Sequence, residues 1–201
     1  MKILTGLLVV LILQTSTKAQ NKAFTDNKCL IETSTGGILI FNNFNKLDLY
    51  FYIDLKNTSV TTTDRNNLFS VGEYALQVLA LDKTKFTGET DQEILGSHAR
   101  SETAYMNNQF KAKLELKAEA VKLKFGSAYF WQYDLPESVA KDVQQLFVTL
   151  VYKDFIISLN TAKLPNQNFE GAKAFLMNAA NSIVFTDRRI NLEYLCRERK
   201  N

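Results

Sequence analysis

Apolar and polar residues along this chain follow two periods, one typical of strands and one typical of helices. Residues 47–55 alternate apolar and polar side chains, which predicts a half-buried strand. The apolar run 37–41 precedes it, and the Asn-rich residues 42–45 between them predict a hairpin turn. The polar residues 20–37, which end in two glycines, are expected to form an arm ahead of the first strand.

A helix is predicted over residues 70–79. Ser70 and Glu73 match a capping box, in which each side chain satisfies a backbone N–H at a helix start. Apolar residues then recur three and four positions apart, as on one buried helical face. They are Val71, Tyr74, Ala75, Val78 and Leu79.

The middle of the chain is less regular. Residues 82–108 are polar, and although Thr90 and Glu93 could cap a short helix, Gly96 is expected to interrupt it. A structureless loop of this length is unusual, so the segment should hold a short element or a function. Residues 110–125 fit both a strand and a helix, and the strand is preferred because Leu116 and Leu123 lie off the helical face.

The last third predicts a meander followed by a helix. Residues 127–135 form an aromatic strand ended by Pro136, and residues 145–152 form a strand that is apolar on both faces. A turn at Lys153-Asp154 leads into the strand 155–160. An amphipathic helix follows, and the tail from Val184 is expected to fray unless Cys196 pins it. The helix positions are Phe169, Ala172, Leu176, Ala179 and Ile183.

These elements show no βαβ alternation and no internal repeat. They predict an α+β fold, a single domain with a mostly antiparallel sheet and helices packed on its faces. The segment AYFWQYDLPE, the meander QQLFVTLVYKDFIISLNTAK and the helix NFEGAKAFLMNAANSI resemble the C-terminal half of the PsbP-like α/β/α sandwich domains. The resemblance implies a sheet with helices on both faces and, as for many bacterial members, no known activity. It carries over no functional residues.

The N-terminus predicts export. A Lys at position 2, an apolar run from Ile3 to Leu13 and small residues before a cut after Ala19 match a secretory signal peptide. The apolar run is shorter than the roughly 20 residues that span a bilayer. We therefore expect a signal peptide at residues 1–19, a globular domain at 20–201, a periplasmic or secreted location, and no transmembrane segment after cleavage.

Charge and cysteine content limit the partners. Without Lys2 and Lys18 the basic and acidic side chains are nearly balanced, so neither nucleic acid nor an anionic membrane is indicated, and the partner is an unknown protein or small ligand. The two remaining cysteines, Cys29 and Cys196, could form a disulfide in an oxidising compartment or stay independent thiols.

Candidate chemistry centres on residues 82–108. His98 is the only histidine, and a catalytic triad would need it beside Ser97 and Asp91, so a solvated loop histidine is the preferred interpretation. Glu89, Asp91, Glu93 and Glu102 could form a glycosidase pair or a calcium site. Solvated acids are preferred because the calcium-loop pattern is incomplete. No metal or other cofactor is expected.

Two further residue sets have competing interpretations. Tyr129, Trp131 and Tyr133 share one strand face and could stack on a sugar, although core packing is preferred. Lys111, Lys113 and Lys117 would share the outer face of a strand and could attract an acidic partner, or simply be solvated.

The function indicated by these features is an exported binding or accessory protein of the cell envelope or secreted space, without enzymatic activity. The alternative is a small hydrolase with a site in residues 82–108. The sequence leaves open whether the protein is an enzyme. It favours a protein without activity, because it lacks a nucleophile–base motif and a metal-ligand cluster.

Overall fold

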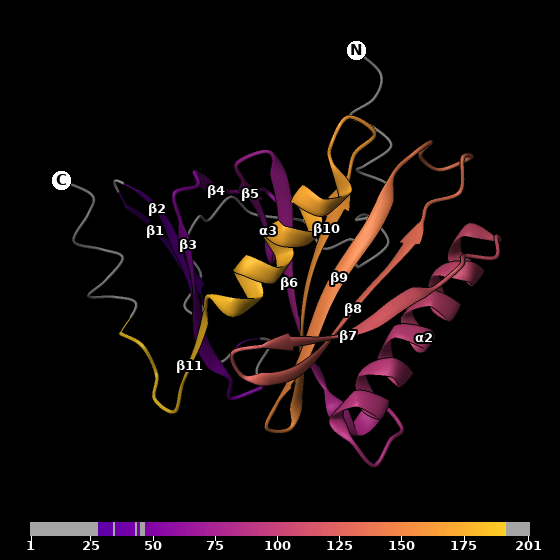
Figure 1. Ribbon diagram of the computed structural model, residues 1–201. Helices are drawn as coiled ribbons and strands as arrows, with labels where there is room; N and C mark the ends of the chain where they lie inside the picture. The colour runs from indigo at the N-terminus through magenta and orange to yellow at the C-terminus, as the bar shows by residue number, and fades with distance from the viewer. Residues whose placement is uncertain (1–27, 34, 43, 45–46, 192–201) are drawn as a thin grey trace.

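The computed structural model describes residues 28–33, 35–42, 44 and 47–191. Within these residues, two antiparallel sheets and two α-helices form the fold (Figure 1). The first sheet, sheet A, has the strand order β1-β2-β3-β11. Its strands are β1 (Lys28–Thr33), β2 (Gly36–Phe41), β3 (Tyr50–Lys56) and β11 (Ile183–Thr186).

The second sheet, sheet B, has the order β4-β5-β6-β10-β9-β8-β7. Its strands are β4 (Val60–Thr62), β5 (Leu68–Val71), β6 (Tyr74–Asp82), β7 (Lys117–Leu123), β8 (Gly126–Asp134), β9 (Gln144–Tyr152) and β10 (Phe155–Lys163). The helices are α2 (Asp91–Phe110) and α3 (Phe169–Asn181), and a short 3₁₀ turn, η2 (Lys83–Lys85), follows β6. The predicted α+β class is confirmed.

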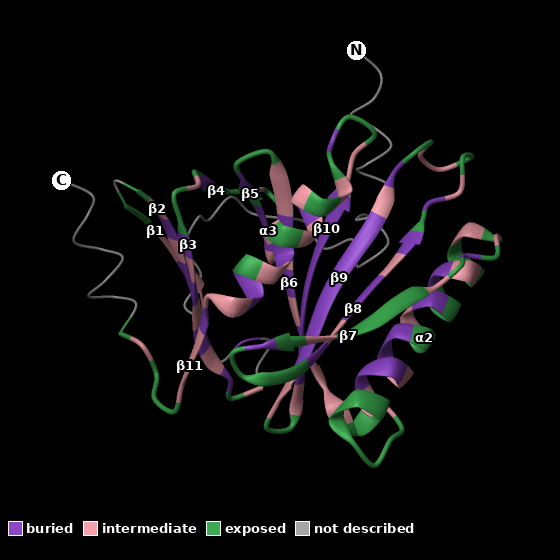
Figure 2. Cartoon of the chain, viewed as in Figure 1, coloured by how far each residue is buried: buried purple, intermediate pink, exposed green. Residues whose placement is uncertain are grey.

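Two apolar layers hold these elements together. The larger lies between sheet B on one side and α3 and sheet A on the other, and it contains Phe41, Phe51, Leu146 and Leu176. The smaller layer lies between the opposite face of sheet B and α2 and contains Trp131. Figure 2 shows the buried stripes of β8 and β9 between the two helices. Sheet B is therefore covered by a helix on each face, as the family resemblance implies.

The meander was predicted well. Strands β8, β9 and β10 lie close to the expected boundaries, and β9 pairs with both neighbours in antiparallel register. The apolar pattern on both faces of β9 results from its central position, with α3 on one side and α2 on the other. The hairpin of β2 and β3 is also confirmed.

The helix predicted over residues 70–79 is wrong. These residues form the hairpin of β5 and β6, turning at Gly72-Glu73 with Val71 opposite Tyr74. Gly72 has a φ of 58°, which suits a glycine in a two-residue turn. The buried positions in β6 alternate at Leu76, Val78 and Ala80, so a period of two describes the segment better than the helical spacing.

The helix in the middle of the chain is much longer than expected. Gly96 does not interrupt α2, because a glycine inside a helix lowers its stability without breaking it. The helix continues to Phe110, so the strand predicted from residue 110 is wrong up to residue 116, and β7 follows. Lys111 is the C-cap of α2 and Lys113 lies between elements, so these residues do not share a strand face with Lys117.

Both ends of the described chain add strands to sheet A. Residues 28–33, expected to be part of a polar arm, form β1, and its Leu30 and Ile31 pair opposite the apolar β2. Residues 184–186, the start of the tail expected to fray, instead belong to β11, which pairs with β3. Phe185 stacks on Tyr152 of β9 at 3.6 Å, so the short strand is held by packing as well as by its hydrogen bonds.

Candidate functional site

The start of α2 is built by local hydrogen bonds. Thr90 is the N-cap, and its hydroxyl accepts a bond from the Glu93 N–H at 3.2 Å. The Glu93 carboxylate accepts bonds from the backbone N–H of Glu89 at 2.8 Å and of Thr90 at 3.1 Å. Both bonds lower the pKa of the Glu93 carboxyl group, and the bond from Glu89 has the larger effect. The predicted capping box is confirmed, and it explains why an acid stands at position 93.

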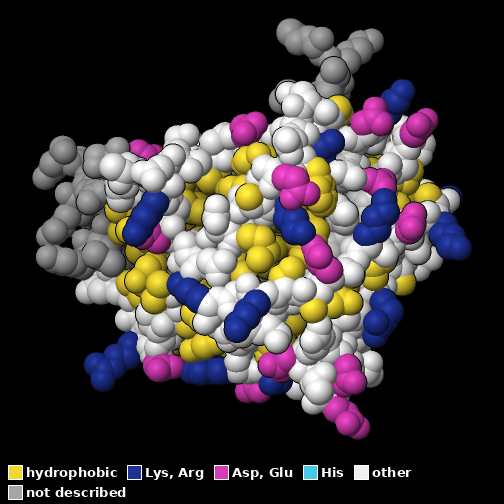
Figure 3. All heavy atoms as spheres, viewed as in Figure 1, with side chains coloured by type: hydrophobic (Ala, Val, Ile, Leu, Met, Phe, Trp, Pro, Cys, Tyr) yellow, Lys and Arg dark blue, Asp and Glu magenta, His cyan; other side chains and the backbone are white. Residues whose placement is uncertain are grey.

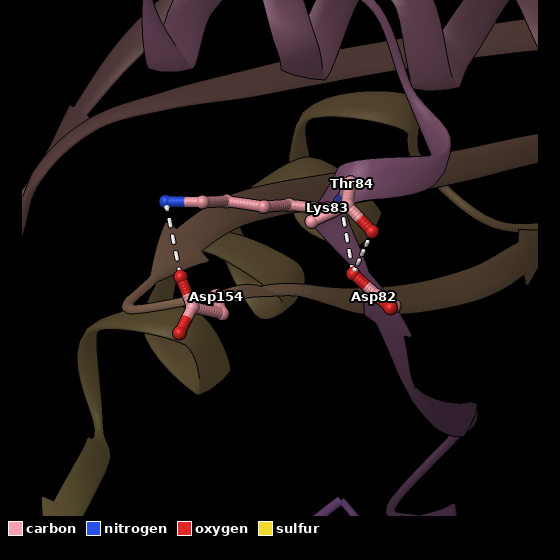
Figure 4. A network of polar contacts seen from close by, with 4 residues as sticks. All are labelled: Asp82, Lys83, Thr84 and Asp154. Carbon is pink, nitrogen blue, oxygen red and sulfur yellow. Dashed lines mark hydrogen bonds and ion pairs between the residues drawn. The ribbon is translucent and has the colours of Figure 1, made fainter.

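The segment that leads into α2 is tied to the β9–β10 turn (Figure 4). Asp82 accepts bonds from the hydroxyl and the backbone N–H of Thr84, which together lower its pKa. Lys83 donates its backbone N–H to the Asp154 carbonyl at 2.9 Å, and its ammonium lies 3.8 Å from the Asp154 carboxylate. The entry of the helix is thus fixed to sheet B.

His98 is buried, with 3% of its surface exposed, so its interpretation as a solvated loop histidine is wrong. Its ring lies edge-on to Phe86 at 5.0 Å and to Trp131 at 5.8 Å. Burial lowers the pKa of His98 to about 4, because the imidazolium would lose its hydration. The ring is therefore neutral at pH 7.

Polar groups continue along the interface of α2 with sheet B. Glu102 lies one turn after His98, and burial raises the pKa of its carboxyl group. Burial, with a smaller contribution from the Glu102 charge, raises the pKa of Tyr133. Gln145 is buried beside Tyr133 on the paired strand. We call these five residues, His98, Glu102, Trp131, Tyr133 and Gln145, the α2 polar layer.

Three nitrogens of the α2 polar layer are buried without a hydrogen-bond partner among the described residues. They are His98 Nδ1, Trp131 Nε1 and Gln145 Nε2. An unsatisfied buried polar group costs about 1–3 kcal/mol, so the layer is less stable than an apolar one of the same shape. The sequence did not suggest this layer, because its members come from α2, β8 and β9.

The residues that a catalytic triad would need are not brought together. The Ser97 hydroxyl accepts a bond from the Thr87 N–H at 3.2 Å and lies 3.1 Å from the Thr87 hydroxyl. Asp91 is exposed in the first turn of α2, whereas His98 faces Trp131 of β8. Neighbouring helix positions face different directions, so Ser97 and His98 cannot form a nucleophile–base pair.

The acidic residues also do not form a ligand set. Glu89, Asp91 and Glu93 are exposed, which agrees with their interpretation as solvated acids. That interpretation is wrong for Glu102, which is partly buried and lies about three turns after Asp91 in α2. Within the described ranges, no group of three or more His, Cys, Asp or Glu residues could hold a metal ion.

The aromatic face of β8 belongs to the core. Trp131 is fully buried and stacks on Phe147 at 3.7 Å with nearly parallel rings, and Tyr133 is 2% exposed. The sugar-stacking interpretation is wrong for these residues, because α2 covers them. Core packing, which was the preferred interpretation of these residues, is confirmed for Trp131 and Tyr133.

A surface that sequence reasoning missed lies at one end of sheet B. Phe125 occupies the two-residue turn between β7 and β8 and is 42% exposed. It packs edge-on against Phe185, which stacks on Tyr152. The Lys124 ammonium lies 4.6 Å from the centre of the Phe125 ring, and that of Lys153 lies 5.3 Å from the Tyr152 ring. The sequence signal for this surface is Phe125 itself, because turn positions are usually occupied by polar residues or glycine.

Of the two cysteines that could form a disulfide, the structure describes Cys29. Cys29 is buried on the outer face of sheet A, in a cluster with Ile40 against which Ile190 packs. Asn42 donates to the Ile190 carbonyl at 2.6 Å and accepts from its N–H at 3.0 Å. Cys196 lies outside the described residues.

The predicted signal peptide, residues 1–19, also lies outside the described residues. In the part of the chain that the structure describes, no helix is both long enough and apolar enough to cross a membrane.

Comparison with known proteins gives a likeness of fold. No protein-family model matches the sequence, and no curated protein matches it. Among solved structures, the solution structure of cyanobacterial PsbP (CyanoP) from Synechocystis sp. PCC 6803 is similar, with a TM-score of 0.50 and 12% sequence identity. The alignment covers 78% of this chain and 95% of that chain, so it extends beyond the C-terminal half. The fold of this chain therefore resembles that of the PsbP-like domains.

Proposed function

We propose that this protein is an exported, non-enzymatic binding or accessory protein of the cell envelope or secreted space. The observation that carries the proposal is the placement of its chemistry-bearing side chains. His98 is buried against Trp131 with a pKa of about 4, and Glu93 is engaged in the helix cap. Both side chains stabilise α2 and its packing. We therefore expect the protein to contact a partner through its exposed surface.

The fold supports the same proposal more generally. Two helices cover a large antiparallel sheet, and the buried residues between them form continuous apolar layers. The exposed ring of Phe125, with Lys124 beside it at the end of sheet B, offers a surface for binding, since exposed apolar groups with charged neighbours are typical of interaction sites.

Export would be supported by the predicted leader and by a disulfide. Cys29 lies in the cluster on which Ile190 packs, and Asn42 holds the Ile190 backbone at that face. The six residues from 190 to 196 could span up to about 20 Å, at roughly 3.3–3.6 Å per residue. We propose that Cys196 reaches Cys29, which would close sheet A in an oxidising compartment.

Assays for turnover test the proposal against the hydrolase alternative. Wild type and His98→Phe are compared on chromogenic esters, phosphomonoesters and glycosides, with folding of both checked by circular dichroism. We expect neither protein to exceed the background rate. Turnover by the wild type that the folded His98→Phe variant loses would contradict the proposal and favour a hydrolase site on α2.

A further inference from the structure

Three aromatic side chains at the end of sheet B form a continuous row, in which Phe125 is exposed and Phe185 and Tyr152 are half-buried. Phe125 contacts Phe185 at 5.3 Å between ring centres, and Phe185 stacks on Tyr152 at 3.6 Å. Lys124 and Lys153 close the two ends of this row through cation–π contacts. The aromatic row, as we call these five residues, therefore joins the β7–β8 turn, β11 and the β9–β10 turn.

Strand register explains why these segments meet. Gly126 at the start of β8 follows the β7–β8 turn, and the pairing of Ala128 with Leu150 brings it level with the end of β9 at Tyr152. Lys153 also forms an ion pair with Asp187 at 2.6 Å, which fixes the end of β11 to the β9–β10 turn. Three segments distant in sequence thus present one edge of the molecule.

The backbone holds Phe125 in an exposed position. The N–H of Lys124 donates to the side chain of Asn181 at the end of α3, at 3.0 Å. In the described part of the chain, Phe125 and Tyr105 of α2 are the exposed large hydrophobic residues, each 42% exposed, and of these two Phe125 has a lysine over its ring. An exposed ring held at the tip of a hairpin is able to contact an apolar region of another molecule or assembly.

The charge around the row is positive. Lys122, Lys124 and Lys153 lie in or next to the two turns, and Arg188 and Arg189 follow β11. Asp187 pairs with Lys153 and Asp154 with Lys83, and Asp48 lies near Tyr50 together with Arg189. The positive charge that remains comes from Lys122, Lys124 and Arg188. Figure 3 shows basic and hydrophobic side chains side by side over the lower left of this face.

Two other acidic residues lie at the start of α2. Asp91 and Glu93 are in the first turn of α2, which covers the opposite face of sheet B from α3. The near balance of charge over the whole chain therefore hides a local excess of basic side chains around the row, within which Asp154 and Asp187 also lie. A negatively charged surface would approach the aromatic row and be repelled from the start of α2.

From this geometry we propose that the aromatic row docks the protein onto an anionic phospholipid membrane. Phe125 enters the headgroup boundary, while Lys122, Lys124, Arg188 and Arg189 lie near the lipid phosphates. Amphipathic surfaces with aromatic residues and flanking basic side chains bind such membranes by this combination. Several basic residues spread along one exposed edge can contact many phosphates of a membrane surface at once, which a single acidic side chain on a protein would not match. The inference rests on the proposed function as an exported binding protein.

Vesicle sedimentation tests this docking. Protein whose N-terminus has been established by intact mass is mixed with vesicles of phosphatidylcholine alone or with about one third phosphatidylglycerol. Because all variants share one N-terminus, a retained leader would be seen in the mass and would not alter comparisons between them. We expect binding to the anionic vesicles only, weakened by added salt.

Matched variants locate the contact. Phe125→Ser and Lys124→Glu should each lower the partition coefficient about tenfold. Tyr105→Ser, which removes an equally exposed ring from α2, and Lys141→Glu, which changes a charge in the β8–β9 loop, should leave it unchanged. Absence of binding to anionic vesicles, or equal losses in both pairs, overturns the proposal. Binding to soluble polyglutamate but not to vesicles would also overturn it and point to an acidic protein.

Discussion

At the scale of single residues, burial decides what each candidate side chain can do. His98 looked like a solvated loop residue because its sequence neighbours are polar, yet it faces Trp131 and Phe86 across a helix–sheet interface. The sequence could not show this, because the contact joins positions far apart in the chain. It did identify Trp131 as a core residue, since the strand around it is strongly apolar.

The buried histidine should make the protein sensitive to acid. The folded pKa of His98, about 4, lies below its unfolded value of 6.5, so the unfolded state binds the proton more tightly. Stability is complete above pH 6.5 and falls between pH 6.5 and 4, by about 3 kcal/mol in total. Urea unfolding at a series of pH values measures this loss.

The raised pKa of Glu102 acts in the opposite sense, because its contribution is present below pH 4.5 and is lost as the pH rises. A comparison of wild type with His98→Gln separates the two groups, because only the histidine contribution disappears in the variant. An unchanged pH slope in a folded His98→Gln protein would show that His98 is hydrated in solution.

Trp131 should be a major contributor to stability. It is fully buried, stacks on Phe147 and makes a tilted ring contact with Tyr133, so Trp131→Ala should lower the free energy of unfolding by about 3–5 kcal/mol. In the wild type its fluorescence should be blue-shifted and resist iodide quenching. Emission typical of a water-exposed indole would contradict the position assigned to α2.

At the scale of elements, period and turn chemistry predicted some segments and failed for others. The meander of β8, β9 and β10 was clear because its strands are long and end in a proline or a charged turn. The helix predicted over residues 70–79 failed because Gly72-Glu73 is a hairpin turn, and a capping pattern occurs there by coincidence. Strand β11 is too short to have a periodic signal and depends on its packing against Tyr152.

Two glycines should respond oppositely to substitution. Gly96 lies inside α2, where a new Cβ would meet only the mobile end of Arg100 and ordinary contacts with Tyr129. Gly96→Ala should therefore raise stability by up to about 1 kcal/mol through helix propensity. Gly72→Ala should lower it by about 1–2 kcal/mol, because a φ of 58° strains a residue with a Cβ. Thermal unfolding of both variants checks the signs, and a loss at Gly96 would indicate closer helix packing.

At the scale of the whole molecule, the sequence predicted a single α+β domain, and the fold agrees with that class. It did not predict the second sheet, because β1 and β11 come from polar or short segments that pair only after the chain has folded. The aromatic row was missed for the same reason, since Phe125, Tyr152 and Phe185 lie in three separate segments.

The proposed disulfide is a property of the whole chain. If Cys29 and Cys196 are joined, the bridge closes most of the domain, and Cys29→Ser should lower the free energy of unfolding by about 2–5 kcal/mol. Mass spectrometry of the unreduced, alkylated protein checks the bond directly. Two alkyl adducts on the exported protein would rule the bridge out, whereas an adduct-free chain would establish it.

The central claim is that this protein acts by contact at its aromatic row, while the polar groups under α2 stay inside. Titration of the isotope-labelled protein with bicelles containing phosphatidylglycerol tests it most directly by nuclear magnetic resonance. The account predicts shifts and broadening of backbone amides at residues 122–126, 152–154 and 185–189, with α2 unaffected. Changes centred on residues 91–110 instead, with the hairpin turns unmoved, would contradict it.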